Sequence, residues 1–483
     1  MKSVLVVAYY FPPSGGPGVQ RVLKYCKYLY EFGWRPVVLT VLDGDYPARD
    51  ESLLKEIPEY VKVYRSKIFE PYSLYRKLTG KKPNVSVDVN TIPKHGEKRK
   101  FSEQIAELIR ATFFIPDARI GWYFYAVKLG KEIIEKEKID IIYSSSPPYT
   151  CSIIARKLHN QSNIPWVAGF RDPWTGFLSA PNRWLLPKFI DCRMEKNVYK
   201  DCDALEVAWE GILKDFKTKY PDIDSSKCFH LDNGYDSQDF PNEKYQRNEK
   251  FTVTYTGSMY GKRNPETFLK AVEELVTESK VDVNKIHLRF AGRFGNEVLE
   301  MFANDTLKNS IEVIHYLPHS ESIKLLLQSE ALLMIVDDFK GNEEIVPGKV
   351  FEYIGSKRPI ITLAPEGAVT KIIRDTGCGM VSNSKDIETI KKIFFNYYTK
   401  FINNDFNVIV NEETIDLQDR LLSSDGLAPS DLSRLAIRSE DKIKLFERRE
   451  ITKKLAQIFD NLTPESFDKR TEVSFPHHTL PHA

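Results

Sequence analysis

The chain has 483 residues, too many for one ordinary hydrophobic core, so two or three domains are expected. Its composition, 42% hydrophobic and 28% charged, is that of a soluble globular protein. The formal net charge of +2 indicates no strongly acidic or basic partner over the whole surface, and no nucleic-acid partner is expected. No apolar run approaches the roughly eighteen residues of a transmembrane helix, so none is predicted.

The six cysteines show no paired short spacing and have no nearby histidines. A metal site or a disulfide framework is therefore not expected, and a reducing cytoplasm is the predicted location. The adjacent Asp337 and Asp338 could hold a cation but are more typical of a surface acid pair. The short apolar run at the N-terminus ends in Pro-Pro-Ser-Gly-Gly, which favours a first buried strand over a signal peptide.

Short apolar runs alternate with helical patterns in the first half of the chain. Continuous apolar strands separated by helices indicate a parallel sheet that is covered on both faces. The predicted strands cover residues 4–10, 36–42, 140–146 and 165–170, and a helical pattern covers residues 18–33.

Residues 61–100 form a predicted basic insertion, with eleven lysines and arginines against three acidic residues. Two interpretations remain open for this segment. It is either a solvated loop or a patch that faces anionic lipid or an anionic acceptor, near which each basic residue gains about 1 kcal/mol.

A second alternation of strands and helices begins near residue 251. Two Rossmann-like doubly wound α/β domains are therefore predicted, and the cleft between them is the default ligand site. The predicted strands cover residues 251–258, 286–293, 311–318, 331–337 and 358–364, and the helices between them cover 264–276, 320–329 and 348–356. The predicted divisions are a first domain at 1–245, a second at 246–435, a charged amphipathic helix within 436–463 and a disordered tail at 464–483.

A glycine turn follows the first predicted strand, in the sequence FPPSGGPGVQR. Gly15 and Gly16 would let backbone amides approach a ligand, and the next helix points its positive end at the turn. Such a turn suits a phosphate. Arg21 either reaches back towards this anion or is an exposed helix arginine.

Polar residues also follow the strand predicted at 165–170, where Arg171 and Asp172 precede Trp174. An aspartate and a tryptophan at a cleft are what sugar hydroxyls and sugar faces favour. The alternative is an Arg–Asp surface pair beside a core tryptophan.

Cations follow two predicted strands of the second half. Gly257 precedes Lys262 and Arg263, and Arg293 follows the next strand. Two cations at such a position can hold a diphosphate.

The sequence EEIVPGKVFEY places Gly348 and Lys349 at the predicted start of a helix, with Glu344 and Glu352 on either side. A diphosphate at this point would be stabilised by the helix dipole and by the lysine. Either glutamate could accept hydrogen bonds from ribose or sugar hydroxyls, although each alone is more often a solvated surface acid.

Together these segments resemble the GT-B glycosyltransferases, in particular glycosyltransferase family four and its 4-like bacterial members. The resemblance covers most of residues 1–400 and the charged helix near 440–461. It rests on the order and spacing of AYYFPPSGGPGVQRVLKYCKYLYEFGWRPVVLT, SSSPPYT, PWVAGFRDPWTG, LDNGYDSQDF, TYTGS and VPGKVFEYIGSKRPII.

The resemblance implies two Rossmann-like domains that face a cleft and a C-terminal helix that crosses back to the first domain. It also implies a nucleotide-sugar donor held mainly by the second domain. Glu352 would bind the donor ribose, Glu344 would touch the donor sugar, and Gly348 and Lys349 would lie along the diphosphate.

Further positions take their expected roles from the same resemblance. Gly15 and Gly16 would lie near the phosphates and the acceptor, and Arg263 occupies the position of a family lysine. Lys262 or Arg293 would help to neutralise the diphosphate.

The chain departs from the common family pattern at three of these places. Glu343 stands directly beside Glu344, so either residue could be the first acid of the family motif. Gly257–Ser258 stands where many members have Gly-Arg, and Arg171–Asp172 stands where many have His-Asp. With Glu344, Arg171 and Asp172 are the expected catalytic residues, near the sugar and the acceptor.

The resemblance implies a retaining, metal-independent glycosyltransferase that needs no cofactor besides its nucleotide-diphosphate sugar. The expected acceptor is a glycan or a lipid-linked glycan in surface polysaccharide or glycolipid synthesis, with peripheral contact at the inner face of the membrane. Two alternatives remain open: a GT-B nucleotide-sugar epimerase, and a non-catalytic GT-B-like protein that binds a nucleotide or a glycan.

Overall fold

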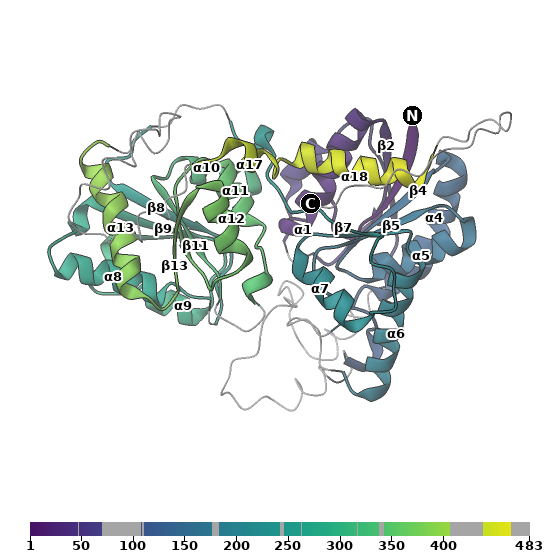
Figure 1. Ribbon diagram of the computed structural model, residues 1–483, viewed down its shortest axis with the longest axis horizontal. Coiled ribbons are helices and arrows are strands. Elements are labelled where there is room, and N and C mark those ends of the chain that lie inside the picture. The colour runs from purple at the N-terminus through teal and green to yellow at the C-terminus, as the bar shows by residue number, and fades with distance from the viewer. Residues whose placement is uncertain are drawn as a thin grey trace.

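The protein is built from two α/β domains, each with a parallel sheet between layers of helices (Figure 1). The computed structural model describes residues 1–46, 48–69, 108, 111–175, 183–241, 246–261, 263–315, 317–337, 342–405 and 438–464.

The first domain contains a seven-stranded parallel sheet with the strand order β3-β2-β1-β4-β5-β6-β7. Its strands are β1 (Lys2–Val7), β2 (Trp34–Val41), β3 (Lys62–Ser66), β4 (Ile141–Ser146), β5 (Trp166–Phe170), β6 (Ala204–Val207) and β7 (Cys228–His230). Its described helices are α1 (Pro17–Leu29), α4 (Tyr123–Glu137), α5 (Thr150–Ser162), α6 (Leu185–Asp201) and α7 (Glu210–Lys219).

The second domain contains a six-stranded parallel sheet with the order β10-β9-β8-β11-β12-β13. Its strands are β8 (Phe251–Thr256), β9 (Ile286–Ala291), β10 (Ile311–Ile314), β11 (Ala331–Ile335), β12 (Ile360–Leu363) and β13 (Gly379–Ser382). Its described helices are α8 (Glu266–Thr277), α9 (Asn296–Met301), α10 (His319–Leu327), α11 (Lys349–Gly355), α12 (Ala368–Thr376) and α13 (Ile387–Ile402).

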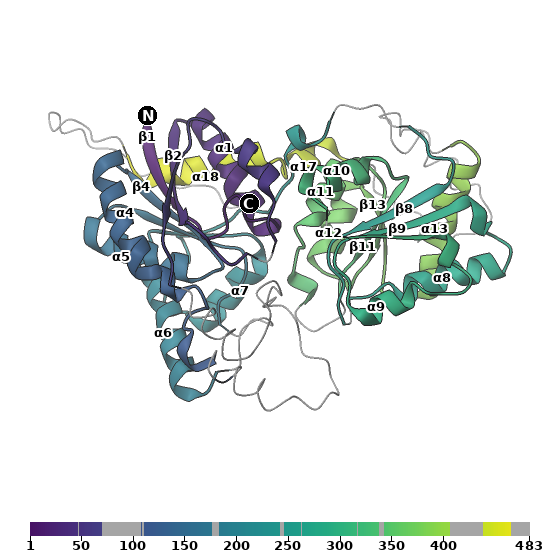
Figure 2. The ribbon, with the colours of Figure 1, turned by 180° about the vertical axis from the view of Figure 1, so that it is seen from behind.

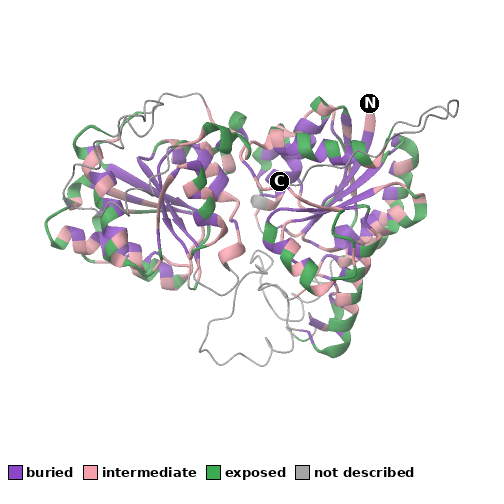
Figure 3. Ribbon diagram, viewed as in Figure 1, coloured by how far each residue is buried: buried purple, intermediate pink, exposed green. Residues whose placement is uncertain are grey.

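The central strands are apolar along their whole length because helices cover both faces of each sheet. Every residue of β4 and of β8 is buried, and Figure 3 shows the buried residues concentrated in the two sheets. This is the arrangement that produces continuous apolar runs rather than alternation. Strands β3, β6, β7 and β13 were not predicted, since at three to five residues they are too short to show a pattern.

Two C-terminal helices, α17 (Glu440–Lys444) and α18 (Arg448–Leu462), lead from the second domain back to the first. In Figures 1 and 2, α17 lies between the domains and α18 lies along the first domain beside α1. The apolar face of α18 is buried in the same core as β1 and α1, where the Phe459 and Trp34 rings meet at 5.3 Å. The predicted fold class, two Rossmann-like domains with a helix that crosses back, is confirmed.

The chain passes between the domains twice, and the two crossings are bonded to each other. The Tyr235 amide donates to the carbonyl oxygen of Phe446 at 3.0 Å, and the Arg448 amide donates to the carbonyl oxygen of Tyr235 at 2.8 Å. The first crossing is also held to α1 through Asp236, which accepts hydrogen bonds from Lys27 and Tyr28. The domains are thus joined by a paired hinge.

Among the helices that the structure describes, none combines the length and the apolar composition needed to cross a bilayer.

Candidate active site

A half-buried lysine marks the carboxyl end of strand β8. Lys349 is the first residue of α11, and its Nζ lies 3.3 Å from the carbonyl oxygen of Thr256 and 3.7 Å from the centre of the Tyr255 ring. Gly257 has a φ of 116°, and a Cβ at this position would lie 3.5 Å from the same nitrogen. Glycine therefore both permits the turn and leaves the ammonium open space in front of it.

The Lys349 ammonium lies in a setting that disfavours its charge. Burial and the nearby Arg263 hold the pKa of Lys349 well below its ordinary value, although Asp337 and Glu352 act in the opposite direction. These two carboxylates are paired elsewhere, Asp337 with Arg263 and Glu352 with His319. An anion beside Lys349 would supply the counter-charge that its surroundings only partly provide.

The structure places the basic residues predicted after β8 and β9 in different surroundings. Arg263 donates from Nε to Asp337 Oδ1 at 2.7 Å, at the carboxyl end of β11. The carbonyl oxygen of Arg293 accepts from the Met259 amide at 2.9 Å, which places Arg293 beside the loop after β8. Lys262 lies outside the described residues, as does Asp338. The basic side chains of Arg263 and Lys349 thus both lie near the Gly257 turn.

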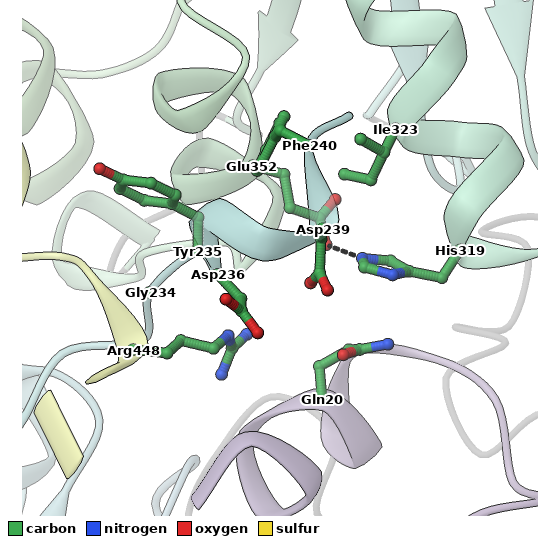
Figure 4. A pocket seen from close by; sticks show the side chains of 10 residues that line it. All are labelled: Gln20, Gly234, Tyr235, Asp236, Asp239, Phe240, His319, Ile323, Glu352 and Arg448. Carbon is green, nitrogen blue, oxygen red and sulfur yellow. Dashed lines mark hydrogen bonds and ion pairs between the residues drawn. The ribbon is translucent and has the colours of Figure 1, made fainter. Parts of the chain in front are cut away.

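Glu352 lines a pocket between the domains, in which it meets His319, the first residue of α10. The Nε2 atom of His319 lies 3.2 Å from Glu352 Oε1. Figure 4 shows the side chains of Glu352, His319 and Asp239 converging on this pocket, with Gln20 of α1 and Arg448 facing them. Residues from both domains and from both hinge segments thus surround one carboxylate.

The charge state of His319 depends on its carboxylate neighbours. Burial lowers the pKa of His319, but the hydrogen bond that its ring donates to Glu352 and the charges of Glu352 and Asp239 outweigh this effect, so the pKa lies above its ordinary value. One oxygen of Glu352 is held by His319, and the other can accept a hydroxyl group.

The remaining predicted glutamate faces the first domain. Glu344 ends the short 3₁₀ helix η7 (Asn342–Glu344), and its Oε1 lies 2.5 Å from Nζ of Lys214 in α7. The neighbouring Glu343 has its carbonyl group packed against Gly367, where a Cβ would lie only 2.0 Å from that oxygen. The Glu344 carboxylate therefore bridges the two domains. Gly348 immediately precedes α11 and accepts from the Phe351 amide at 3.3 Å.

The glycine turn of the first domain approaches the second domain through residues 48–50. The Gly15 amide donates to the carbonyl oxygen of Ala48, and the Asp50 amide donates to that of Pro13, both at 2.9 Å. Asp50 in turn accepts from the amide of His319 at 3.3 Å. Gly16 precedes α1 with a φ of 96° and has open space where a Cβ would stand. The turn is therefore connected to the pocket that contains Glu352.

Arg171 is bonded to the backbone of the first domain. Its guanidinium donates to the carbonyl oxygens of Gly18, at 2.8 Å, and Pro147. It therefore ties the start of α1 to the turn after β4, and is placed as a positioning residue for the glycine turn. Burial raises the pKa of the adjacent Asp172, although Arg171 opposes the rise.

Arg21 does not face the glycine turn. Its buried guanidinium forms an ion pair with Glu206 of β6 and donates to the carbonyl oxygens of Leu231, at 2.7 Å, and Asp232, at 2.8 Å. Both earlier interpretations, an anion ligand and an exposed helix arginine, are corrected by this contact. Arg21 instead holds α1 to the sheet and to the first hinge segment.

Of the residues that line the pocket, only Glu352 was predicted, and His319 and Asp239 are the two that converge on it. His319 stands in a sequence that reads as an ordinary helix start, and the available signal was its position beyond the carboxyl end of β10. Asp239 lies in LDNGYDSQDF, one of the segments on which the family resemblance rests, but no role was predicted for it.

Among the described residues, no three side chains of His, Cys, Asp or Glu are grouped as they would be to hold a metal ion.

Comparison with protein families gives a match over residues 236–396 to the glycosyl transferases group 1 family. This range includes Lys349, Arg263, Glu344 and Glu352. A sequence comparison with curated proteins finds no match.

Solved structures with similar architecture include HepE from Anabaena in complex with UDP, with a TM-score of 0.57 and 10% identity over 95% of this chain and 100% of that one. Sucrose-phosphate synthase from Thermosynechococcus elongatus has a TM-score of 0.56 and 12% identity, over 96% and 99% of the two chains. A TarM variant from S. aureus, in complex with fondaparinux, α-GlcNAc-glycerol and UDP, has a TM-score of 0.56 and 12% identity, over 95% and 100%.

Identities this low show a shared fold, and the family match covers most of the second domain. The chain has the GT-B fold, and its residues 236–396 match the glycosyl transferases group 1 family.

Proposed function

We propose that this protein transfers a sugar from a nucleotide-diphosphate sugar to a glycan or lipid-linked glycan acceptor, as a retaining, metal-independent enzyme related to family four. The observation that carries the proposal is the position of Lys349, whose Nζ lies at the carboxyl end of β8 beside the Gly257 turn, with Arg263 and Glu352 nearby. The two basic side chains suit the diphosphate of such a donor, and the carboxylate can accept hydrogen bonds from its ribose hydroxyls.

Each residue has a part in holding the donor. Lys349 and Arg263 contact the diphosphate, with the backbone at Gly257 and Gly348 alongside. The free oxygen of Glu352 accepts from the ribose hydroxyls, while His319 fixes the orientation of the carboxylate.

The same cations serve the chemical step. When the bond between the anomeric carbon and the diphosphate oxygen breaks, negative charge develops on the leaving group. Lys349 and Arg263 stabilise that charge, and stabilisation by groups already in place is commonly the largest contribution to catalysis.

The first domain provides the acceptor side. The turn at Gly15 and Gly16 approaches the sugar, Arg171 keeps that turn in position, and Asp172 lies beside it. Glu344 reaches the donor sugar after release from Lys214.

The acceptor belongs to surface polysaccharide or glycolipid synthesis, and the enzyme works in the cytoplasm at the inner face of the membrane. Most of the basic insertion at 61–100 on which membrane contact was first predicted lies outside the described residues. HepE and the TarM variant were both solved with UDP, which supports a uridine nucleotide as the first candidate to test.

The test is a screen of UDP-, GDP- and ADP-sugars for thermal stabilisation and for slow donor hydrolysis. A ligand at one hundred times its Kd stabilises the folded state by about 2.7 kcal/mol, so a true donor is readily detected. Loss of both signals in Glu352→Gln, with both retained in the exposed control Glu300→Gln, supports the proposal. Conversion of the sugar nucleotide to an epimer without acceptor would instead establish the epimerase, and no binding or hydrolysis of any donor would overturn the enzyme assignment.

A further inference from the structure

Helix α6 of the first domain has its polarity reversed over its first turns. Its buried face carries two carboxylates, Asp191 and Glu195, together with Pro187. Its outer face carries Leu185, 87% exposed, and Phe189, 62% exposed. A helix of a globular protein normally turns its apolar stripe inward, so this arrangement needs a reason.

The apolar residues at the start of α6 form one patch. The patch consists of Phe113, Trp184, Leu185, Leu186 and Phe189, each of them exposed by 48% or more. The indole Nε1 of Trp184 donates to Oγ1 of Thr112 at 2.9 Å, which sets Phe113 next to the helix.

A buried arginine builds the base of this patch. Arg183 pairs with Asp191 at 2.8 Å and donates to the carbonyl oxygens of Ala111, Phe114 and Pro116. These bonds lock residues 111–116 against the start of α6. The exposed apolar side chains therefore stand on a fixed platform.

The outer stripe of α6 becomes basic after its second turn. Leu185, Phe189, Arg193, Lys196 and Lys200 follow one another at spacings of three and four residues, which places them on one face of the helix. All five are exposed. The stripe thus begins with apolar side chains and continues with cations.

The acids of α6 do not neutralise these cations. Asp191 is paired with Arg183, Asp201 is paired with Arg156, and Glu195 is buried beside Lys219. Among the described residues, neither Lys188 nor the three cations of the stripe has an ion-pair partner. The exposed charge of the helix is therefore positive throughout.

Apolar side chains beside unpaired cations are the combination that binds an anionic lipid surface, since the rings and aliphatic groups enter the headgroup boundary and the cations meet the lipid phosphates. We propose that the outer face of α6, with Phe113, is a docking surface for the anionic membrane. Figure 1 shows α6 projecting from the first domain, and Figure 3 shows exposed residues along it. The surface lies on the domain assigned to the acceptor, and the proposal does not depend on the donor site.

The direct test is sedimentation of the full chain with vesicles of phosphatidylcholine alone and of phosphatidylcholine mixed with phosphatidylglycerol. We expect binding to the anionic vesicles that salt weakens, and a loss of at least about tenfold in the double variant Leu185→Ser/Phe189→Ser. Leu299→Ser, at a 41% exposed leucine of the second domain, is the matched control and should bind like the wild type. Lys188→Gln/Arg193→Gln should bind more weakly and depend less on salt.

Tryptophan fluorescence gives a second readout at the patch itself. Trp184 is 48% exposed, whereas the other five tryptophans are at most 6% exposed. Brominated anionic lipid should quench the tryptophan fluorescence of the wild type and leave that of Trp184→Phe nearly unchanged.

Unaltered sedimentation of the double serine variant, or the absence of fluorescence quenching in the wild type, would overturn the proposal. So would wild-type dimers in the absence of lipid that the double serine variant abolishes, because the occupant would then be a second copy. None of these measurements needs a donor, so the lipid surface and the transferase activity can fail separately.

Discussion

At the scale of single residues, the setting of Lys349 determines how it can act. The ammonium contacts an aromatic ring and a carbonyl oxygen, and burial shifts its equilibrium towards the neutral amine. A bound diphosphate would reverse that shift, because an anion at close range favours the charged form. Ligand binding and protonation of Lys349 are therefore coupled.

This coupling predicts a pH dependence for nucleotide diphosphate affinity. Above pH 7.5 the terminal phosphate, with a pKa of about 6, is ionised, so a further loss of affinity with rising pH reports on the protein. We expect the affinity of the wild type for the nucleotide diphosphate to fall as pH rises through the lowered pKa of Lys349. Near neutral pH, Lys349→Gln should bind the nucleotide about tenfold or more weakly, and its affinity should depend less on pH. Isothermal titration between pH 7.5 and 9.5 measures both, and parallel profiles for the two proteins would refute the coupling.

The pair of His319 and Glu352 predicts a second pH effect, on stability. Because the pKa of His319 lies above 6.5 in the folded state, the pair stabilises fully below pH 6.5 and loses its contribution as pH rises through the raised value. Asp239 supports the charge on His319, whereas Lys24 opposes it. We expect His319→Gln to be about 1–2 kcal/mol less stable than the wild type at pH 6, with a smaller difference at pH 9. Urea unfolding at both pH values tests this, and a difference that grows with pH would contradict it.

At the scale of elements, one carboxylate joins α4 to two strands of the first sheet. Glu137 accepts from Arg35 of β2 at 2.7 Å and from Lys62 and Tyr64 of β3 at 3.0 and 2.6 Å. Hydrogen bonds from Tyr64 and Arg35 lower the pKa of Glu137 to about 2. The contact fastens the edge strand β3 to α4, in addition to the backbone pairing of β3 with β2.

Removing this charge should destabilise the first domain in a defined pH range. The pKa of Glu137 is lowered from 4.5, so its contribution is complete above about pH 4.5 and disappears as pH falls towards about 2. We expect Glu137→Gln to lower the free energy of unfolding by about 2 kcal/mol at pH 7 and by less at pH 3.5. The exposed neighbour Glu135→Gln should be nearly neutral in the same urea unfolding series. An equal cost at both pH values would rule out the ionic explanation.

Helix α18 depends on one buried ring for its attachment to the first domain. Phe459 is fully buried and packs edge-on against Trp34. We expect Phe459→Ala to lower the free energy of unfolding by about 3–5 kcal/mol, because apolar burial is lost and a cavity is left behind. Leu445→Ala, at a 55% exposed leucine between α17 and α18, should change stability by less than about 0.5 kcal/mol. Limited proteolysis after α18 is the second readout, and an unchanged cleavage rate in Phe459→Ala would contradict its anchoring role.

At the scale of the whole molecule, the candidate site is built by both domains and by the paired hinge. Asp236 shows how firmly the hinge is held. Burial opposes the ionisation of its carboxyl group, but the charge of Lys24 and the hydrogen bonds from Lys27 and Tyr28 have the larger effect. The pKa of Asp236 therefore lies below its ordinary value. The hinge segments run directly into the pocket that contains Glu352. A change in domain angle would therefore alter the shape of this pocket.

The parts of this arrangement that could be predicted are those that local patterns encode. Buried strands read as apolar runs, and glycine turns at their ends mark the edge where Gly16, Gly257 and Lys349 now lie. Arg21 shows where prediction ends: its partner Glu206 is 185 residues away, and only the folded sheet brings the two together. The contact between His319 and Glu352 could not be predicted either, because the spacing of residues along the chain does not indicate which two helices will meet.

The central claim is that Lys349, Arg263 and Glu352 hold a nucleotide diphosphate. Isothermal titration of UDP, GDP and ADP into the wild type, Lys349→Gln, Glu352→Gln and the exposed control Lys371→Gln tests it most directly. The account predicts that at least one nucleotide binds, that both site variants lose about tenfold or more in affinity, and that the control is unchanged. Failure of all three nucleotides to bind, or equal affinity in the site variants, would contradict it.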